Sequence, residues 1–286
     1  MLSFLPGPVK GVLSLSLYVI NTIFWTMVLF LVALLKLLVP VSGWRKFCSK
    51  VMITIGNIWI FFNNCNMWLI NKIHWDVAGI EGLKMNRWYL VVANHQSWID
   101  ILVLQKVFYR KAPFHKFFLK KELFWVPFLG LAWWALDYPF LERSSSAQKD
   151  IETTMRACDK FKTLPVSIMN FVEGTRFTVE KHREQRSPYS HLLKPKAGGI
   201  AFVLAAMGEQ LDSILDVTIV YPQGAEGFWA FLCGRVSEIK VRVESLPINE
   251  EISGDYFKDR KFRKIFMSWL NALWTEKDKR IAALLE

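Results

Sequence analysis

The sequence has few cysteines, and their spacing excludes the common cysteine-based metal and redox motifs. Its 286 residues include four cysteines, at positions 48, 65, 158 and 233. Zinc sites and redox motifs place cysteines close together in pairs, whereas these four are scattered. We therefore predict that the four cysteines are buried, behave as small apolar side chains and lie in a reducing compartment. We predict no metal site.

Acidic residues are scarce relative to basic ones. The chain carries 36 lysine and arginine residues against 25 aspartate and glutamate residues, a formal net charge of +11. This balance suits anionic lipid surfaces, phosphate-bearing substrates or an acidic protein donor. It would also suit nucleic acid, but the chain has no zinc-finger spacing, no heptad-linked basic region and no evident aromatic sheet motif. We therefore expect no nucleic-acid partner.

Charged residues are missing altogether from residues 11–35, a stretch long enough to cross the hydrocarbon core of a bilayer. No basic cluster precedes this stretch and no small-residue cleavage site follows it, so a signal peptide is not indicated. A second apolar stretch, residues 51–70, is interrupted by asparagines at positions 57, 63, 64 and 66. Both stretches predict contact with a membrane.

The link between the two apolar stretches is basic, with Arg45, Lys46 and Lys50. Two full crossings would put these charges on the side opposite the globular domain, against the tendency of basic residues to stay in the cytoplasm. We therefore predict a membrane-inserted helical hairpin in one leaflet, with its basic residues at the headgroups. The alternative is one true span followed by one interfacial helix. Residues 1–73 form this predicted anchor, and residues 74–286 form a globular domain.

The globular part alternates strand-like and helical patterns, which predicts an α/β sheet with helices on its faces. The strand patterns cover residues 89–93, 117–119, 138–141, 167–172, 217–220 and 238–243. The helical patterns cover residues 99–107, 122–136, 147–161 and 199–207. Residues 256–285 show helical apolar spacing with a charged opposite face. We expect this last helix to pack on the domain rather than to form a second anchor.

The stretch WYLVVANHQSWIDIL contains a histidine and an aspartate that can meet. His95 follows a strand pattern, and Asp100 lies five positions later, after the predicted helix N-cap Ser97. A strand end, a turn and a new helix let the two side chains fold back towards each other, whereas one continuous helix would separate them by about 140°. A histidine held by a carboxylate is a candidate general base near neutral pH. The alternative is structural: Asp100 closes a capping box and His95 is a turn histidine.

The stretch FVEGTRF, residues 171–177, predicts a phosphate site. Gly174 allows backbone N–H groups to approach a ligand closely, and Arg176 can grip a phosphate with its planar fork. The alternative is an ordinary turn with a surface arginine.

The stretch FLKKELFWVPFLG, residues 118–130, is basic at its start, where Lys120 and Lys121 open a helical pattern. Arg143 follows the next strand pattern. These cations suit a phosphate ligand, but a solvated basic face is the alternative for the two lysines.

Together these stretches resemble the PlsC-type glycerolipid acyltransferases. NHQSWID matches the N-H-x-x-x-x-D motif of the family, and KKELFWVPFLG with the later Arg143 is similar to its K-x-x-L-x-x-x-P-x-x-G motif. FVEGTR matches the third motif, and Val220-Tyr221-Pro222 resembles the short fourth motif, although Tyr221 stands where the family usually has a small or aliphatic residue. The four stretches follow the family's order, from His95 to Pro222.

The resemblance implies a glycerol-3-phosphate acyltransferase-like α/β sheet with flanking helices. It also implies a membrane-bound enzyme, most similar to bacterial 1-acyl-glycerol-3-phosphate acyltransferases. Such an enzyme moves a fatty acyl chain from acyl-CoA or acyl carrier protein to the sn-2 hydroxyl of lysophosphatidic acid, giving phosphatidic acid. The implied location is the cytoplasmic side of a bacterial inner membrane, and no cofactor is implied beyond the acyl donor.

The resemblance further implies roles for individual residues. His95 would take the proton of the acceptor hydroxyl, and Asp100 would orient the imidazole. The implied substrate-binding residues are Glu173, Gly174, Thr175, Arg176, Lys120 and Arg143. Within this set, Glu173 would order its loop rather than move a proton. The thioester donor is already activated, so no covalent nucleophile is needed, and the G-x-S-x-G elbow of acyl hydrolases is absent from the sequence.

Two other functions stay open from the sequence. The first is an acyltransferase of the same family that acts on a lysophospholipid or a glycolipid. A pocket that requires a free phosphomonoester would distinguish the lysophosphatidic acid enzyme from this alternative. An acceptor without that group would leave a buried charge of the pocket without its partner, and such a loss discriminates strongly between substrates. The second is a non-catalytic, membrane-attached binding protein, and the intact His95 and Asp100 speak against it.

Overall fold

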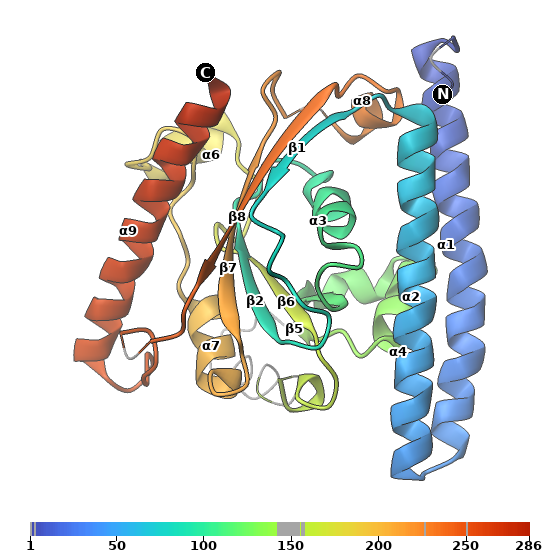
Figure 1. Cartoon of the computed structure of the whole chain (residues 1–286), viewed down its shortest axis with the longest axis horizontal. Coiled ribbons are helices and arrows are strands. Elements are labelled where there is room, and N and C mark those ends of the chain that lie inside the picture. The colour runs from blue at the N-terminus through green and yellow to red at the C-terminus, as the bar shows by residue number, and fades with distance from the viewer. Residues whose placement is uncertain (1, 3, 142–154, 156–157, 226, 250) are drawn as a thin grey trace.

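A computed structural model describes residues 2, 4–141, 155, 158–225, 227–249 and 251–286 of the chain (Figure 1). Its helices are α1 (Gly7–Leu38), α2 (Ser42–Ile70), α3 (Asp100–Phe108), the 3-10 helix η1 (Lys121–Trp125), α4 (Leu129–Ala135), α6 (Val179–Gln185), α7 (Gly198–Met207), α8 (Phe228–Leu232) and α9 (Arg260–Leu285). Its strands are β1 (His74–Ala78), β2 (Tyr89–Ala93), β3 (His115–Phe117), β4 (Leu119–Lys120), β5 (Phe140–Leu141), β6 (Ser167–Phe171), β7 (Ser213–Val220) and β8 (Glu238–Leu246).

A six-stranded sheet with the order β1-β8-β7-β2-β6-β3 forms the centre of the domain. Strand β2 pairs in parallel with both of its neighbours, β6 and β7, whereas β7 and β8 pair antiparallel. The carboxyl ends of β2, β6 and β7 therefore meet at one edge of the sheet. The predicted α/β architecture, a sheet with flanking helices, is confirmed.

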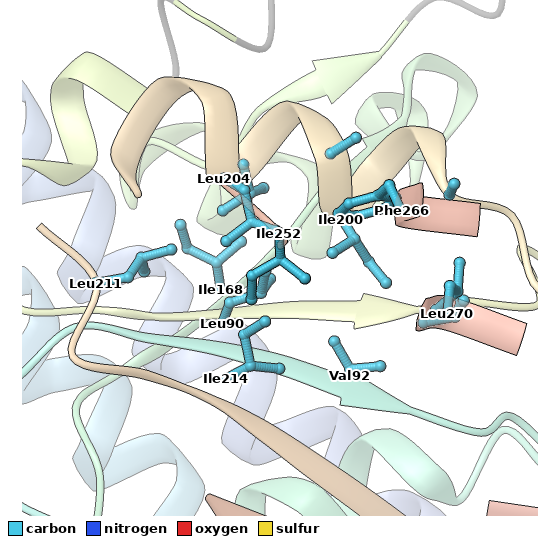
Figure 2. Close-up of a cluster of buried hydrophobic side chains, with 14 of the residues drawn as sticks. Leu90, Val92, Ile168, Ile200, Leu204, Leu211, Ile214, Ile252, Phe266 and Leu270 are labelled. Atoms are coloured by element: carbon cyan, nitrogen blue, oxygen red, sulfur yellow. The ribbon is translucent and has the colours of Figure 1, made fainter. Parts of the chain in front are cut away.

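Helices cover both faces of the sheet, because successive apolar residues of its central strands point to opposite sides. Leu90 and Val92 of β2 belong to a core cluster with residues of α7 and α9. Figure 2 shows this cluster, in which these two side chains lie below Ile200 and Leu204 of α7. The alternate residues of β2, such as Val91, pack with α3 on the other face.

Helix α9 packs across the first of these faces and carries a buried charge pair. Lys277 of α9 and Asp216 of β7 are both 0% exposed, and Lys277 Nζ lies 2.5 Å from Asp216 Oδ1. Arg280 donates to the other carboxylate oxygen at 2.9 Å. The helix begins at Arg260, later than its apolar spacing suggests, because the Asp259 side chain accepts two backbone N–H groups of its first turn.

Helices α1 and α2 lie side by side as an antiparallel hairpin on the far side of α3 (Figure 1). Two of the asparagines that interrupt α2 face α1: Asn66 Nδ2 donates to the Ser14 carbonyl at 3.0 Å, and Asn21 Nδ2 donates to Asn63 Oδ1 at 2.8 Å. Such hydrogen bonds join helices in apolar surroundings. Within the described residues, α1 is the one helix that is long and apolar enough to cross a membrane. The predicted hairpin is present, and its relation to a bilayer stays a prediction.

The hairpin contacts the domain along most of the length of α1. Near the start of α1, a Cβ on Gly11 would lie within 3 Å of Cys233 and Trp229 of the α8 region. Near the end of α1, Lys36 forms an ion pair with Asp137 at 2.8 Å. Large apolar side chains of α1 are exposed at helical spacing, among them Val12, Val19, Ile20, Ile23, Phe24, Met27, Leu31 and Leu35.

One expected helix is broken. Residues 122–136 form η1 and α4 instead of a single helix. Pro127 has no backbone N–H to donate, and Gly130 lies so near the Phe124 carbonyl oxygen that a Cβ would come within 1.8 Å of it. The chain therefore turns sharply between the two helices.

Other boundaries also differ from the sequence patterns. Strand β1 was not expected from the sequence, because its residues show no recognisable strand pattern. Strand β7 begins at Ser213, before the expected residues 217–220. The polar Asp216 in its first half interrupts the apolar pattern on which the prediction rested. The strand expected over residues 117–119 is the junction of β3 and β4, and the one expected over residues 138–141 is shortened to β5. Most of the helix expected over residues 147–161 lies outside the described residues.

Candidate active site

Three of the predicted motifs meet at one edge of the sheet, because each follows the carboxyl end of one of three neighbouring parallel strands. His95 follows β2, Glu173 follows β6 and Tyr221 follows β7. The His95 carbonyl also accepts the Phe177 N–H at 2.7 Å, which joins the turns after β2 and β6. Open α/β sheets bind ligands at this edge.

The predicted approach of the His95 and Asp100 side chains is confirmed. His95 Nδ1 lies 2.7 Å from Asp100 Oδ2. A carboxylate at Nδ1 favours the tautomer that carries its proton there, so Nε2 is left as the proton acceptor. Asp100 is fully buried, while the His95 side chain keeps 14% of its surface exposed and is reachable by a substrate.

The turn before α3 has the hydrogen bonds of the predicted capping box. The regular helix begins at Asp100, and Ser97 Oγ accepts the Ile99 N–H at 3.4 Å. Asp100 Oδ2 accepts the backbone N–H groups of Gln96 at 2.7 Å and Ser97 at 2.9 Å. The carboxylate thus closes the turn and holds the imidazole at once, so the structural and functional alternatives for this residue are not exclusive.

The Glu173 carboxylate is buried and holds two backbone groups. Oε1 accepts the His95 N–H at 2.9 Å, and Oε2 accepts the Leu193 N–H at 3.0 Å. Burial raises the pKa of Glu173 to about 7, although the two hydrogen bonds oppose that shift. Because the side chain is 0% exposed, this geometry fits the loop-ordering role better than contact with a substrate.

The turn after Glu173 combines a glycine and an arginine as the phosphate motif requires. Gly174 has φ +67°, a conformation that favours glycine. The Arg176 guanidinium lies over the Trp98 ring, 4.3 Å from its centroid. Thr175 Oγ1 accepts from Lys181 Nζ at 2.8 Å. Stacking on an aromatic ring leaves the in-plane N–H groups of a guanidinium able to bind a ligand, and the phosphate role of Arg176 stays a prediction.

The structure describes one of the two remaining predicted cations. Lys120 is exposed in β4, and within the described residues it makes no hydrogen bond or ion pair with His95, Asp100 or Arg176. Arg143 lies outside the described residues. Their substrate-binding roles therefore stay predictions from the motif.

Two residues at the site were missed by sequence reasoning. Tyr221, noted only as a departure from the fourth motif, donates its hydroxyl to Asp100 Oδ1 at 2.6 Å. The alternation of β7 indicates only the face of Tyr221, which it shares with Val217 and Ile219, towards α3, and not its partner. Lys196 lies over Gly174: a Cβ on that glycine would be 3.3 Å from Lys196 Nζ. Nothing local in the sequence places this lysine at the turn.

A cavity of about 410 Å³ opens beside the histidine turn. Its lining combines apolar and polar groups and includes Gln96, Phe177, His191, Tyr221 and Ile281. Across the part of the chain that the structure describes, no group of three or more histidine, cysteine, aspartate or glutamate side chains could hold a metal ion.

Several curated relatives are acyltransferases of lysophospholipids. The chain is 29% identical over 210 residues to 1-acyl-sn-glycerol-3-phosphate acyltransferase 3 of Arabidopsis thaliana, covering 68% of this chain and 54% of that protein. It is 22% identical to lysocardiolipin acyltransferase 1 of Danio rerio, covering 97% and 72%. It is 26% identical to lysophosphatidylinositol acyltransferase 10 of Caenorhabditis elegans, covering 77% and 62%. The chain thus spans 54% to 72% of the length of these relatives.

A solved structure has a similar fold. It is the 1-acyl-sn-glycerophosphate acyltransferase PlsC from Thermotoga maritima, with a TM-score of 0.51 and 17% identity over 94% of this chain and 96% of that one. The sequence model of the Acyltransferase family matches residues 74–222, which is just over half of the chain. That match begins where β1 begins and ends just after Tyr221, so it contains the whole His95 edge of the sheet. The chain therefore belongs to the Acyltransferase family.

Proposed function

We propose that this chain is a membrane-bound acyltransferase that acylates the sn-2 hydroxyl of 1-acyl-glycerol-3-phosphate and gives phosphatidic acid. The observation that carries the proposal is the His95–Asp100 pair, 2.7 Å apart at the carboxyl end of β2 and next to the Gly174–Arg176 turn. The names of the Arabidopsis thaliana and Thermotoga maritima proteins support this acceptor.

The chemistry needs a base but no enzyme nucleophile. His95 Nε2 accepts the proton of the acceptor hydroxyl while its oxygen attacks the thioester carbonyl. The tetrahedral intermediate collapses, the C–S bond breaks, and the thiolate takes the proton back from the imidazolium. Asp100 stabilises the transient imidazolium, and general-base help of this kind is typically worth about 10²–10⁴-fold in rate.

The acceptor phosphate would bind at the turn after Glu173. Arg176 offers a planar fork of donors, Gly174 gives the backbone access, and Lys196 adds a second cation above the same glycine. Lys120 and Arg143 complete the proposed set from the second motif. The donor is acyl-CoA or acyl carrier protein.

A second candidate acceptor is a larger lysophospholipid. The Danio rerio and Caenorhabditis elegans relatives carry the names of lysocardiolipin and lysophosphatidylinositol acyltransferases, whose acceptors bear a phosphodiester. A glycolipid acceptor is a further alternative. A non-catalytic binding role has less support, because His95 and Asp100 keep a geometry suited to proton transfer.

The hairpin is proposed to lie in one leaflet, on the cytoplasmic side. The domain contacts α1 from Gly11 to Lys36, a distance of about 38 Å at 1.5 Å per residue. This exceeds the hydrocarbon core of about 30 Å, so a perpendicular α1 would draw the contacting parts of the domain across the bilayer. A hairpin that lies in the membrane plane avoids this and buries the exposed apolar side of α1. The bacterial inner membrane expected from the resemblance is kept as part of this proposal.

The test is a donor-by-acceptor activity matrix with purified protein and His95→Ala as its control. Acyl-CoA and acyl carrier protein donors are each offered to lysophosphatidic acid, lysophosphatidylinositol, a lysocardiolipin and a monoacyl glycolipid. We expect lysophosphatidic acid to have the highest kcat/KM and His95→Ala to lower kcat by about 10²–10⁴-fold. Transfer that persists in His95→Ala would overturn the mechanism. A preference for phosphodiester acceptors would favour the second candidate.

A further inference from the structure

We infer that Tyr221 is a positioning residue of the acyl transfer, holding the second oxygen of Asp100 so that the carboxylate keeps His95 aligned. The inference rests on the proposed function and adds a third member to its His–Asp pair. It starts from a contact that joins two elements far apart in sequence: Tyr221, after β7, and Asp100, at the start of α3, are hydrogen-bonded at 2.6 Å.

The two oxygens of Asp100 have separate tasks. Oδ2 faces His95 Nδ1 and the backbone N–H groups of Gln96 and Ser97, at 2.7, 2.7 and 2.9 Å. Oδ1 faces the Tyr221 hydroxyl. Three donors on one oxygen cannot by themselves stop the carboxylate from tilting. A fourth donor on the other oxygen fixes its plane and therefore the direction of the bond to the imidazole.

The tyrosine is well placed to hold that plane. Tyr221 is 3% exposed and lies between Val220, the last residue of β7, and Pro222, whose ring restricts the backbone. Its burial, followed by the nearby charge of Asp100, raises the pKa of the Tyr221 phenol well above the usual value. The hydroxyl therefore stays protonated and donates throughout the working pH range.

The hydroxyl also weakens the pull of Asp100 on the imidazolium. Each hydrogen bond to a carboxylate disperses part of its negative charge. Without the Tyr221 hydroxyl, Asp100 would bind the proton-carrying form of His95 more strongly. The other charged groups packed around the pair are Glu173, which holds the His95 backbone, and Arg176, which lies over Trp98. Neither of them touches Asp100 Oδ1.

The experiment is the pH dependence of kcat/KM and of kcat in the full-length protein. Tyr221→Phe removes the hydroxyl and keeps the ring. We expect the acid limb of the profile, where kcat/KM falls at low pH, to move to higher pH by about 0.5–1 unit. We also expect kcat to fall about 3- to 10-fold, with little change in the acceptor KM. Tyr138→Phe is the matched control, because it removes another buried hydroxyl, which donates to the His115 carbonyl rather than to the pair.

A second variant protects the test against a folding defect. A fluorinated tyrosine incorporated at position 221 keeps the shape and the hydrogen bond, but its hydroxyl is a stronger donor. The acid limb should then move down, opposite to Tyr221→Phe. An unchanged limb with fluorotyrosine, or equal changes in Tyr221→Phe and Tyr138→Phe, would overturn the inference. If His95→Ala is inactive in the same assays, either of these outcomes counts against the role of Tyr221 alone, and the proposed function still stands.

Discussion

The imidazole ring of His95 lies flat on the phenyl ring of Phe171, with 4.0 Å between the ring centroids and 14° between the planes. Phe171 is the last residue of β6 and stacks in turn on Phe117 of β3. Asp100 holds one edge of the imidazole and Phe171 holds one face. The proposed base is therefore fixed in two directions before any substrate arrives, which reduces the reorganisation needed for reaction.

Replacing Phe171 by leucine should lower kcat by about 3- to 10-fold with little effect on either KM, because the base loses orientation but the binding groups stay. Steady-state kinetics with the preferred donor and acceptor would measure it. Phe202→Leu is the control, since it disrupts a similar stack with Phe257, 4.2 Å between centroids. An equal loss of kcat in both variants would show that general packing, and not the base, responds.

The raised pKa of Glu173 predicts a stability that depends on pH. Its pKa is about 7 in the fold against the usual 4.5, so the folded state favours the protonated form. The contribution to stability is full below about pH 4.5 and is lost as pH rises through about 7. Glu173→Gln should remove this slope. It should also be less stable at acid pH by about 1–3 kcal/mol, because an amide nitrogen would face one of the two backbone N–H groups.

The measurement is the free energy of unfolding in detergent at pH values from 4.5 to 8, for wild type and Glu173→Gln. Glu276→Gln serves as control, since this carboxylate of α9 is 62% exposed. The gap between wild type and Glu173→Gln should narrow as pH rises. Two parallel curves would contradict the assignment of the slope to Glu173.

The proposed phosphate site predicts a change confined to the acceptor. Arg176→Ala should raise the acceptor KM more than the donor KM, and Arg176→Lys should not fully restore it, because the planar fork is lost. Lys196→Ala should act in the same direction but more weakly, while Lys194→Ala, two residues away and exposed, should change little. An increase found only in the donor KM would move Arg176 to the thioester side.

The proposed one-leaflet hairpin predicts the side of the membrane from which its tip can be labelled. A single cysteine at Ser42, the exposed first residue of α2, is placed in a chain whose native cysteines are replaced. A membrane-impermeant maleimide should label it in inside-out vesicles and not in intact cells. A cysteine at the exposed Glu184 of α6 reports the side of the domain. Labelling of Ser42→Cys in intact cells would rule out the hairpin and leave a spanning pair.

The sequence was most informative where one residue pattern leads to one local geometry. Residues 89–93 are apolar on both sides of a strand and form β2 as expected. The break at Asn94 and the acid at Asp100 then bring the imidazole and carboxylate together across a turn. Such contacts need only a few residues of chain, so local rules describe them well.

The parts that could not be predicted depend on contacts between distant segments. Tyr221 meets Asp100 across 121 positions, and its role follows only once β7 is known to lie beside β2. Lys196, which lies just before α7, reaches Gly174 in the same way. Asp216 reads as a break in an apolar strand until its partner Lys277 is in place. These contacts depend on which segments lie side by side in the fold, and the local residue pattern does not give that.

The buried pair of Asp216 and Lys277 also has a consequence for the order in which the protein matures. Asp216 lies in β7, in the middle of the sheet, while its partner Lys277 belongs to α9, which the ribosome makes later. Until α9 emerges, the nascent sheet contains a carboxylate without its cation and a core face that lacks one of its two helices. Under the proposed one-leaflet arrangement, the hairpin is made before α9 and would reach the membrane first. The domain would then complete its assembly at the bilayer surface.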